Sequence, residues 1–115
     1  MQNSHLILDV SSLESIPLNH KIGFKQVIIA NGDKKTIPQI AKAYIPKASI
    51  VEEHQHRDMT EYFYILEGNC LFLIDNVEYN VKENGFVMIP PQTKHSIITD
   101  KVSVRFIYWG CIEST

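Results

Sequence analysis

Apolar and polar residues alternate over short stretches of this chain, and turn-forming residues separate these stretches. Blocks rich in Val, Ile, Tyr and Phe recur along the chain, whereas no long stretch repeats apolar residues at helical spacing. This pattern predicts β-strands rather than helices. We expect strands at residues 5–9, 24–30, 39–45, 49–56, 60–67, 69–75, 77–81, 85–90, 95–99 and 102–110.

The segments between these strands are rich in Asn, Asp and Gly, which tolerate the positive φ angles of tight hairpin turns. They read ANGDKK, EGN, IDNVE, KENG and TDK. Many short strands in an open sheet would leave long unpaired edges, which invite aggregation. We therefore expect an all-β fold in which the sheet closes into a barrel or sandwich.

Some of the expected strands are apolar on both faces. In the strand at 60–67, alternation places Glu61, Phe63 and Ile65 on one face and aromatic or aliphatic residues on the other. One face lines the interior, and the second face also needs cover. Either the N-terminal strands cover it or it is a homodimer interface, and the sequence leaves both possibilities open.

Composition narrows the class of protein. The 115 residues fit one domain, and 44% hydrophobic with 21% charged residues is typical of an ordinary globular chain. No apolar run reaches the ~20 residues of a membrane span, and the start lacks the features of a signal peptide. A net charge of −2 with scattered Lys and Arg argues against nucleic acid as a partner. We expect a cytoplasmic protein in which Cys70 and Cys111 are free thiols.

The candidate chemistry lies in the stretch HQHRDMTE and in a later histidine. His54 and His56 are two residues apart, so in a strand they would point to the same face about 6.6 Å apart. Glu61 begins the next strand and can reach the same face, and His95 is a fourth candidate. Imidazole and carboxylate groups in this combination suit one divalent ion of Fe, Mn, Ni, Cu, Co or Zn. Four ligands leave two positions of an octahedral ion free, which is typical of a catalytic site.

The same residues closely resemble the first motif of the cupin superfamily. That motif reads Gly, five residues, His, any residue, His, three or four residues, Glu, six residues, Gly. Here it spans residues 48–68, and every spacing fits from His54 through Glu61 to Gly68. Ala48 replaces the leading glycine, which places the local turn geometry in question rather than the ligands.

The second cupin motif runs Gly, five residues, Pro, any residue, Gly, two residues, His. Residues 84–95 supply Asn84, Pro90, Gln92 and His95 at these places, so both glycines are replaced. Asn tolerates positive φ well, so we expect the first turn to be kept. Gln92 is a weaker substitute, and the loop that carries His95 could therefore be shifted.

The resemblance implies a cupin-type double-stranded β-helix, or jelly-roll barrel, formed by residues 1–115 as a single domain. It also implies one divalent metal near the barrel mouth, held by His54, His56, Glu61 and His95, and often a homodimer. It does not imply one reaction, because this superfamily includes many enzymes and also proteins without catalysis. Function must be argued from the site.

Two functions remain open. The first is an enzyme whose metal acts on a small oxygen-bearing substrate, as a dioxygenase or as a sugar isomerase or epimerase. Cysteine dioxygenases replace the glutamate ligand, so the presence of Glu61 argues against that branch. The second is a module that binds a sugar or small acid and catalyses nothing.

Three residues are candidates for substrate binding. Phe63 and Ile65 share a face with Glu61 and so can line the pocket, although they can equally be ordinary core residues. Arg105 lies in an otherwise apolar strand, where an inward side chain would bind a carboxylate or phosphate. The alternative is that Arg105 extends to solvent.

Overall fold

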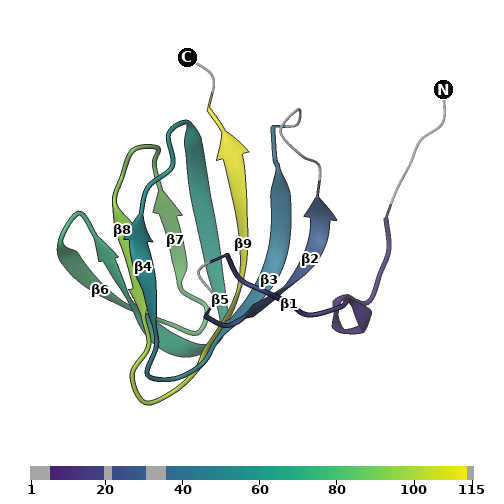
Figure 1. The fold of residues 1–115 in the computed structure, drawn as a ribbon, viewed down its shortest axis with the longest axis horizontal. Coiled ribbons are helices and arrows are strands. Elements are labelled where there is room, and N and C mark those ends of the chain that lie inside the picture. The colour runs from purple at the N-terminus through teal and green to yellow at the C-terminus, as the bar shows by residue number, and fades with distance from the viewer. Residues whose placement is uncertain (1–5, 20–21, 31–35, 114–115) are drawn as a thin grey trace.

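The computed structural model describes residues 6–19, 22–30 and 36–113. Within these ranges the chain forms a short 3-10 helix and nine strands (Figure 1). They are η1 (Val10–Ser12), β1 (Ile16–Pro17), β2 (Phe24–Ala30), β3 (Gln39–Ile45), β4 (Ile50–His54), β5 (Met59–Ile74), β6 (Val77–Lys82), β7 (Phe86–Ile89), β8 (His95–Ile98) and β9 (Val104–Ile112). The expectation of an all-β fold is confirmed, and no helix in the described ranges has the length and apolar character needed to cross a membrane.

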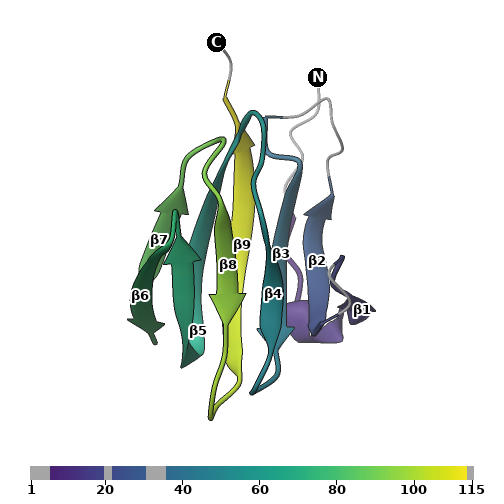
Figure 2. The same cartoon turned by 60° about the vertical axis from the view of Figure 1, so that its left-hand side comes forward.

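The strands form one curled antiparallel sheet in the order β1-β2-β3-β9-β5-β8-β4, with β6 and β7 also paired to β5. The first half of β5 pairs with β7 and β9, and its second half pairs with β6 and β8. β5 therefore passes from one wall of the roll to the other, and β4 and β8 close over the interior (Figures 1 and 2).

Inward-facing side chains of both walls form the core of the roll. Glu61, Phe63 and Ile65 of β5 are buried, whereas Tyr64 between them is exposed, which confirms the predicted alternation. The remaining core contains Ala43, Ile45, Val51, Cys70, Phe72, Val87, Ile89, Ile97, Val104 and Phe106. Cys70 and Cys111 are free, as expected.

β5 corrects the prediction of two strands joined by a turn at EGN. The chain stays extended through this segment, and Gly68 has a φ of 84° beside a register shift between Ile65 and Glu67. A Cβ at Gly68 would collide with the backbone carbonyl of Ser103 on the adjacent segment. The glycine therefore permits a bulge where the strand bends between walls, not a hairpin.

Two other predicted turns lie within the described residues and are confirmed. Asp75 and Asn76, between β5 and β6, both have positive φ, which is the conformation of a two-residue hairpin turn. Asn84 also has positive φ, at 71°, so this turn is kept as expected. Most of the ANGDKK segment, residues 31–35, lies outside the described residues.

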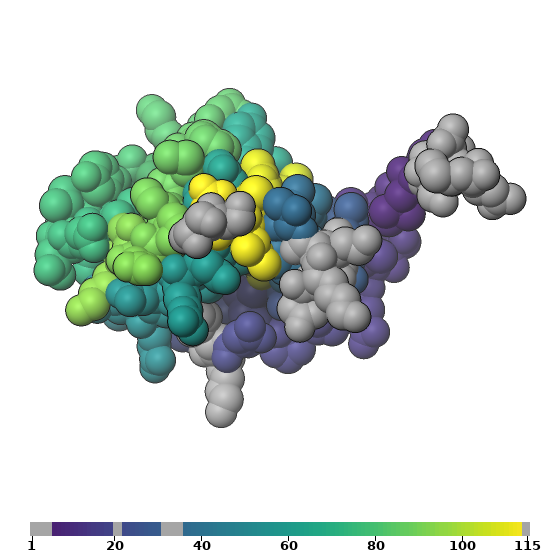
Figure 3. Space-filling view, turned by 90° about the horizontal axis from the view of Figure 1, so that it is seen from above, coloured from purple at the N-terminus to yellow at the C-terminus, as the bar shows by residue number. Residues whose placement is uncertain are grey.

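The N-terminal segment differs from the prediction. Residues 6–9 are not a strand, while His5 lies outside the described residues. Asp9 instead caps η1 by accepting a hydrogen bond from Ser11 N, and Ile7 is 90% exposed. The segment stands away from the body of the protein (Figure 3). An exposed apolar segment gains no burial that would hold it in a sheet.

The outer face of β5, β7 and β9 is apolar and partly uncovered. Tyr62 stacks on Trp109 at 5.4 Å between ring centroids, and Phe86 lies 6.1 Å from Tyr62. Phe86 and Met88 are 56% and 55% exposed. The described N-terminal residues therefore do not cover this face, and a homodimer interface stays a prediction.

Candidate metal centre and adjoining cavity

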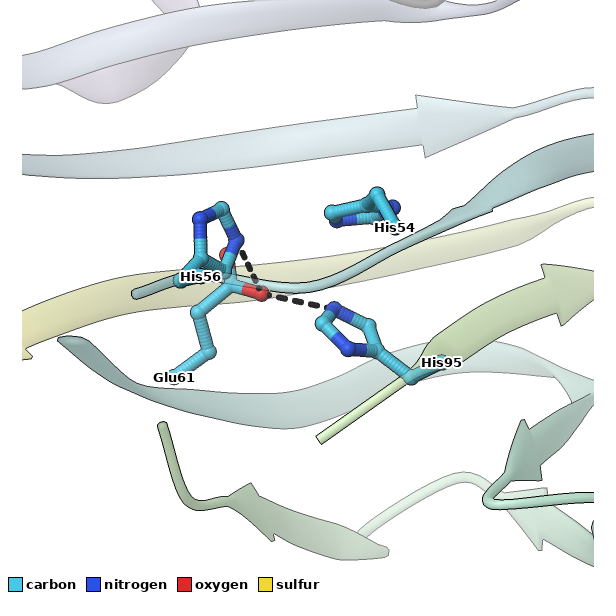
Figure 4. A group of neighbouring side chains, drawn as sticks. All are labelled: His54, His56, Glu61 and His95. Atoms are coloured by element: carbon cyan, nitrogen blue, oxygen red, sulfur yellow. Dashed lines mark hydrogen bonds and ion pairs between the residues drawn. The ribbon is translucent and has the colours of Figure 1, made fainter. Parts of the chain in front are cut away.

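Four side chains from three strands and a loop converge inside the roll, as predicted. His54 ends β4, His56 lies in the loop that follows, Glu61 lies near the start of β5, and His95 begins β8 (Figure 4). One ligand atom from each residue lies within 4.8 Å of the others, so the group could hold a metal ion. His54 and His95 face each other in the β4–β8 ladder.

The placement of His56 corrects one detail of the sequence prediction. The strand expected at 49–56 ends at His54, and the β4–β8 ladder is irregular between Val51 and His54. His56 thus approaches the cluster from a loop and not from the same strand face. The loop is held by Gln92, whose backbone N–H donates to the carbonyl oxygen of His56 at 2.6 Å.

Glu61 is the centre of the cluster. Its Oε1 lies 3.0 Å from Nε2 of His56 and 3.0 Å from Nε2 of His95. Glu61 is only 7% exposed, and His95 is 1% exposed. The carboxylate is therefore largely buried, with imidazoles in contact with it.

The pKa values follow from this geometry. Burial alone would raise the pKa of Glu61, but its close contacts with the imidazoles of His56 and His95 outweigh burial and lower the pKa to about 2. The Glu61 carboxylate, 3.0 Å away, raises the pKa of His56, against the opposing effect of burial. Without a metal, the pair therefore favours a charged imidazolium beside a carboxylate.

Backbone carbonyls orient two of the imidazoles. Nδ1 of His54 lies 3.0 Å from the carbonyl oxygen of Glu52, and Nδ1 of His95 lies 2.9 Å from that of Thr93. When Nδ1 donates to a carbonyl, Nε2 carries the lone pair and becomes the ligand atom. This arrangement is typical of histidines that bind metals.

The residues present fit a divalent ion. His56 Nε2 is buried and lies close to Glu61 Oε1, yet it has no hydrogen bond of acceptable direction. A buried polar atom without a partner is costly, and a metal ion at the centre of the group would bind it. Three nitrogen donors and one oxygen donor also match the preferences of Fe, Mn, Co, Ni, Cu and Zn ions.

A cavity of about 130 Å³ adjoins the cluster. Its polar lining includes His54, His56, Glu61, Lys25 and Tyr108. The apolar lining includes Ile45, Val51, Phe63, Ile97 and Phe106. A small molecule in this cavity would contact the candidate ligands on one side and hydrocarbon on the other.

The three predicted substrate residues are placed differently. Phe63 lines the cavity, whereas Ile65 is fully buried in the core and is not among the lining residues. Arg105 is exposed on the outer face, where its guanidinium lies 4.6 Å from the centre of the Tyr44 ring. The structure therefore does not bring Arg105 to the cluster, because strand alternation points it away from Val104 and Phe106.

Sequence reasoning missed Lys25 and Tyr108, which both line the cavity. Gln39 links them, since its Oε1 accepts from Lys25 Nζ at 3.3 Å and from the Tyr108 hydroxyl at 3.4 Å. Burial, and then the charge of Glu61, raise the pKa of Tyr108 to about 12. The alternation of Tyr108 with Phe106 was a usable signal for its position, but a lysine in an apolar strand usually indicates an edge exposed to solvent.

The positions where motif glycines are replaced keep glycine-like backbones. Ala48 and Gln92 have φ angles of 55° and 60°. The loop that carries His95, which could have been shifted by the loss of the glycine, still brings His95 to the cluster, and Gln92 itself adopts the left-handed conformation.

Comparisons with known proteins agree with this geometry. A family model described as the cupin domain matches residues 43–110. An uncharacterized protein of Methanocaldococcus jannaschii is 34% identical over 73 residues, which make up 64% of this chain and 58% of that protein. The matched region thus spans less than two thirds of that relative.

Solved structures share the fold. A Thermotoga maritima protein described as a predicted oxalate decarboxylase has a TM-score of 0.81 at 19% identity, covering 93% of this chain and 99% of that one. The Halomonas protein KdgF has a TM-score of 0.81 at 9% identity, covering 96% of both chains. The polyketide cyclase RemF of Streptomyces resistomycificus has a TM-score of 0.82 at 15% identity, covering 96% and 81%.

At these identities the structural likeness establishes the fold and not the activity. The fold is the cupin jelly roll, as the sequence motifs imply. Because the cupin-domain match extends over more than half of the residues, the chain belongs to the cupin family.

Proposed function

We propose that this cupin is a small metal-dependent enzyme that acts on a small oxygen-bearing substrate. The observation that carries the proposal is the convergence of His54, His56, Glu61 and His95 beside a cavity of about 130 Å³. These four residues would hold one divalent ion. When bound, such an ion supplies Lewis-acid chemistry and, for a redox-active metal, the means to react with dioxygen.

The chain's own residues have separate tasks in this proposal. The carbonyls of Glu52 and Thr93 fix the orientation of His54 and His95. Phe63 and its apolar neighbours exclude water from the inner side of the cavity. Tyr108, with its pKa raised to about 12, stays protonated and can donate a hydrogen bond at neutral pH. Dioxygenase chemistry and sugar isomerase or epimerase chemistry are the two reaction types proposed.

A second candidate is a module that binds a small acid or sugar without catalysis. It is favoured by the lack of a spare base: among the residues that line the described cavity, Glu61 is the one carboxylate, and it already contacts two imidazoles. The free thiols of Cys70 and Cys111 support a cytoplasmic location for either function.

The test combines metal analysis with activity. The protein is purified, stripped, and reloaded separately with Fe(II), Mn(II), Ni(II), Co(II), Cu(II) and Zn(II), because affinity order alone does not identify the working metal. We expect about one ion per chain, and oxygen uptake or isomerisation with at least one member of a panel of sugars, diketones and small acids. Failure to bind any of these ions would reject the enzyme proposal, and a ligand bound but returned unchanged would favour the module.

A further inference from the structure

Lys25 is a lysine that the fold buries inside the roll. It is 9% exposed and pairs with Ala43 of β3, a core residue. Burying an ammonium group is costly unless a charge or several hydrogen bonds compensate for the lost water. Within the described part of the chain, no carboxylate forms an ion pair with Lys25. Its positive charge is therefore available to a ligand.

Gln39 positions this ammonium group. Its Oε1 accepts one hydrogen bond from Lys25 Nζ at 3.3 Å and one from the Tyr108 hydroxyl at 3.4 Å. An ammonium group has three N–H donors, so the contact with Gln39 leaves two of them for other acceptors. Lys25 and Tyr108 thus lie together at one wall of the cavity that both line.

The charge of the cavity favours an anion. Glu61 is the one carboxylate among the lining residues, and its oxygen is already shared by two imidazoles. With a divalent ion bound, three positive charges of the metal and Lys25 would face the single negative charge of Glu61. An incoming carboxylate would reduce this imbalance in a mainly apolar cavity, where charge-assisted hydrogen bonds are stronger than in bulk water.

The size of the cavity limits the ligand. At about 130 Å³ it is smaller than the ~300–1,000 Å³ that drug-sized ligands occupy. Ile45, Val51 and Phe106 add an apolar wall suited to a short carbon chain. These features together favour a small acid over a large sugar.

We propose that Lys25 binds the carboxylate of a small hydroxy acid or oxo acid whose second oxygen faces the His54–His56–Glu61–His95 cluster. The part of this inference that concerns the second oxygen rests on the proposed function. The contact between Lys25 and the carboxylate does not require a metal, so the two can be tested separately.

The experiment compares acids with their uncharged amides. Glycolate, lactate and pyruvate, and then glycolamide, lactamide and pyruvamide, are titrated into the Mn(II)-loaded and the metal-free protein by calorimetry. We expect at least one acid to bind the wild-type protein about ten-fold or more tightly than its amide. Lys25→Met should weaken binding of that acid about ten-fold or more and leave the amide within about two-fold.

Two further variants control for general effects. Lys42→Met removes a lysine from the outer face of the adjacent strand, and we expect it to leave acid binding unchanged. Lys25→Arg should keep a preference for the acid. Circular dichroism and the metal content of each variant show whether the fold and the cluster are intact, and Lys25→Gln replaces the Met variant if that one does not fold.

Equal binding of the acid by wild type and Lys25→Met, or no preference of the wild type for any acid, would overturn the inference. Those results would leave the proposed function in place if the protein still binds metal. Failure to bind metal would instead reject the proposed enzyme, while the titrations of metal-free protein would still decide the role of Lys25.

Discussion

At the scale of single residues, Glu61 holds the cluster together, because its carboxylate contacts two of the imidazoles. Its carboxylate is buried, yet its pKa is lowered to about 2 because the imidazoles of His56 and His95 contact it. A metal ion would take over these interactions, since it binds the same carboxylate and neutral imidazoles. Protons and metal therefore compete for one group of atoms.

We expect Glu61→Gln to lower metal affinity at least about 100-fold, because the charged oxygen ligand is lost while the side chain keeps its size. Metal titration with a competing chelator measures the change. Glu67→Gln is the matched control, since Glu67 is on the same strand but exposed. Equal affinity in wild type and Glu61→Gln would show that Glu61 is not a ligand.

The metal-free protein should show a stability optimum in mild acid. The raised pKa of His56 adds stability below about pH 6.5 that is lost as the pH rises through the folded-state value. The lowered pKa of Glu61 adds stability above about pH 4.5 that is lost as the pH falls toward 2. The difference in Tm between wild type and Glu61→Gln, measured from pH 2 to 9, should therefore be largest between about 4.5 and 6.5. A difference that does not vary with pH would contradict this coupling.

At the scale of elements, β5 connects the two walls of the roll, because it pairs with four other strands. It also carries Glu61 and Phe63. Its bend depends on Gly68, where a side chain would collide with the carbonyl of Ser103. The close approach of Gly68 to Ser103 thus leaves no room for a side chain beside the bend.

Gly68→Ala should destabilise the protein by about 2 kcal/mol or more, because alanine is strained at a φ of 84° and its Cβ collides with backbone. Chemical denaturation measures this loss. A loss below about 0.5 kcal/mol would mean that the bulge can relax without cost.

Ala48→Gly should have the opposite effect. Ala48 has a φ of 55°, and its exposed side chain can be removed without leaving a buried cavity. Glycine removes the strain of the left-handed conformation, but it also raises the conformational entropy of the unfolded chain. Because the first effect is larger, we expect the free energy of unfolding to rise by about 0.5 kcal/mol. The same denaturation experiment measures the gain, and a clear loss of stability would contradict the strain at this turn.

Much of the strand arrangement, and the convergence of the four site residues, was predictable from the sequence. The alternation in residues 61–66 and the motif spacings predicted the buried face and the four converging side chains. The continuity of β5 was not predictable, because EGN and IDNVE both contain turn residues and only pairing with β9 distinguishes a bulge from a hairpin. Lys25 was missed for a related reason: its inward direction depends on pairing with Ala43, which local sequence does not reveal.

At the scale of the whole molecule, the outer face of β5, β7 and β9 is an apolar surface that the described residues leave partly uncovered. Its exposed members include Phe86 and Met88, beside the stacked pair of Tyr62 and Trp109. Contiguous apolar surface rimmed by polar residues often marks an interface. The alternative cover by N-terminal residues does not hold for those that the structure describes.

We expect the protein to form a homodimer through this face, and Met88→Lys to shift it toward monomer because a charge would be buried at the interface. Light scattering coupled to size-exclusion chromatography measures the mass over a range of concentrations. Val102→Lys is the control, since Val102 is exposed in the loop between β8 and β9. A monomeric wild type at every concentration would reject the dimer.

The direct pairing of His54 with His95 has a consequence for the lifetime of the protein. A slip of one residue between β4 and β8 would turn His95 to the other face, so an ion could be bound only by the correctly paired sheet. Ion binding would then favour the native pairing. It would also stabilise the folded state, by about 2.7 kcal/mol when the free ion concentration is 100 times Kd. Scarcity of the metal would thus shorten the protein's survival against proteolysis as well as prevent the proposed reaction.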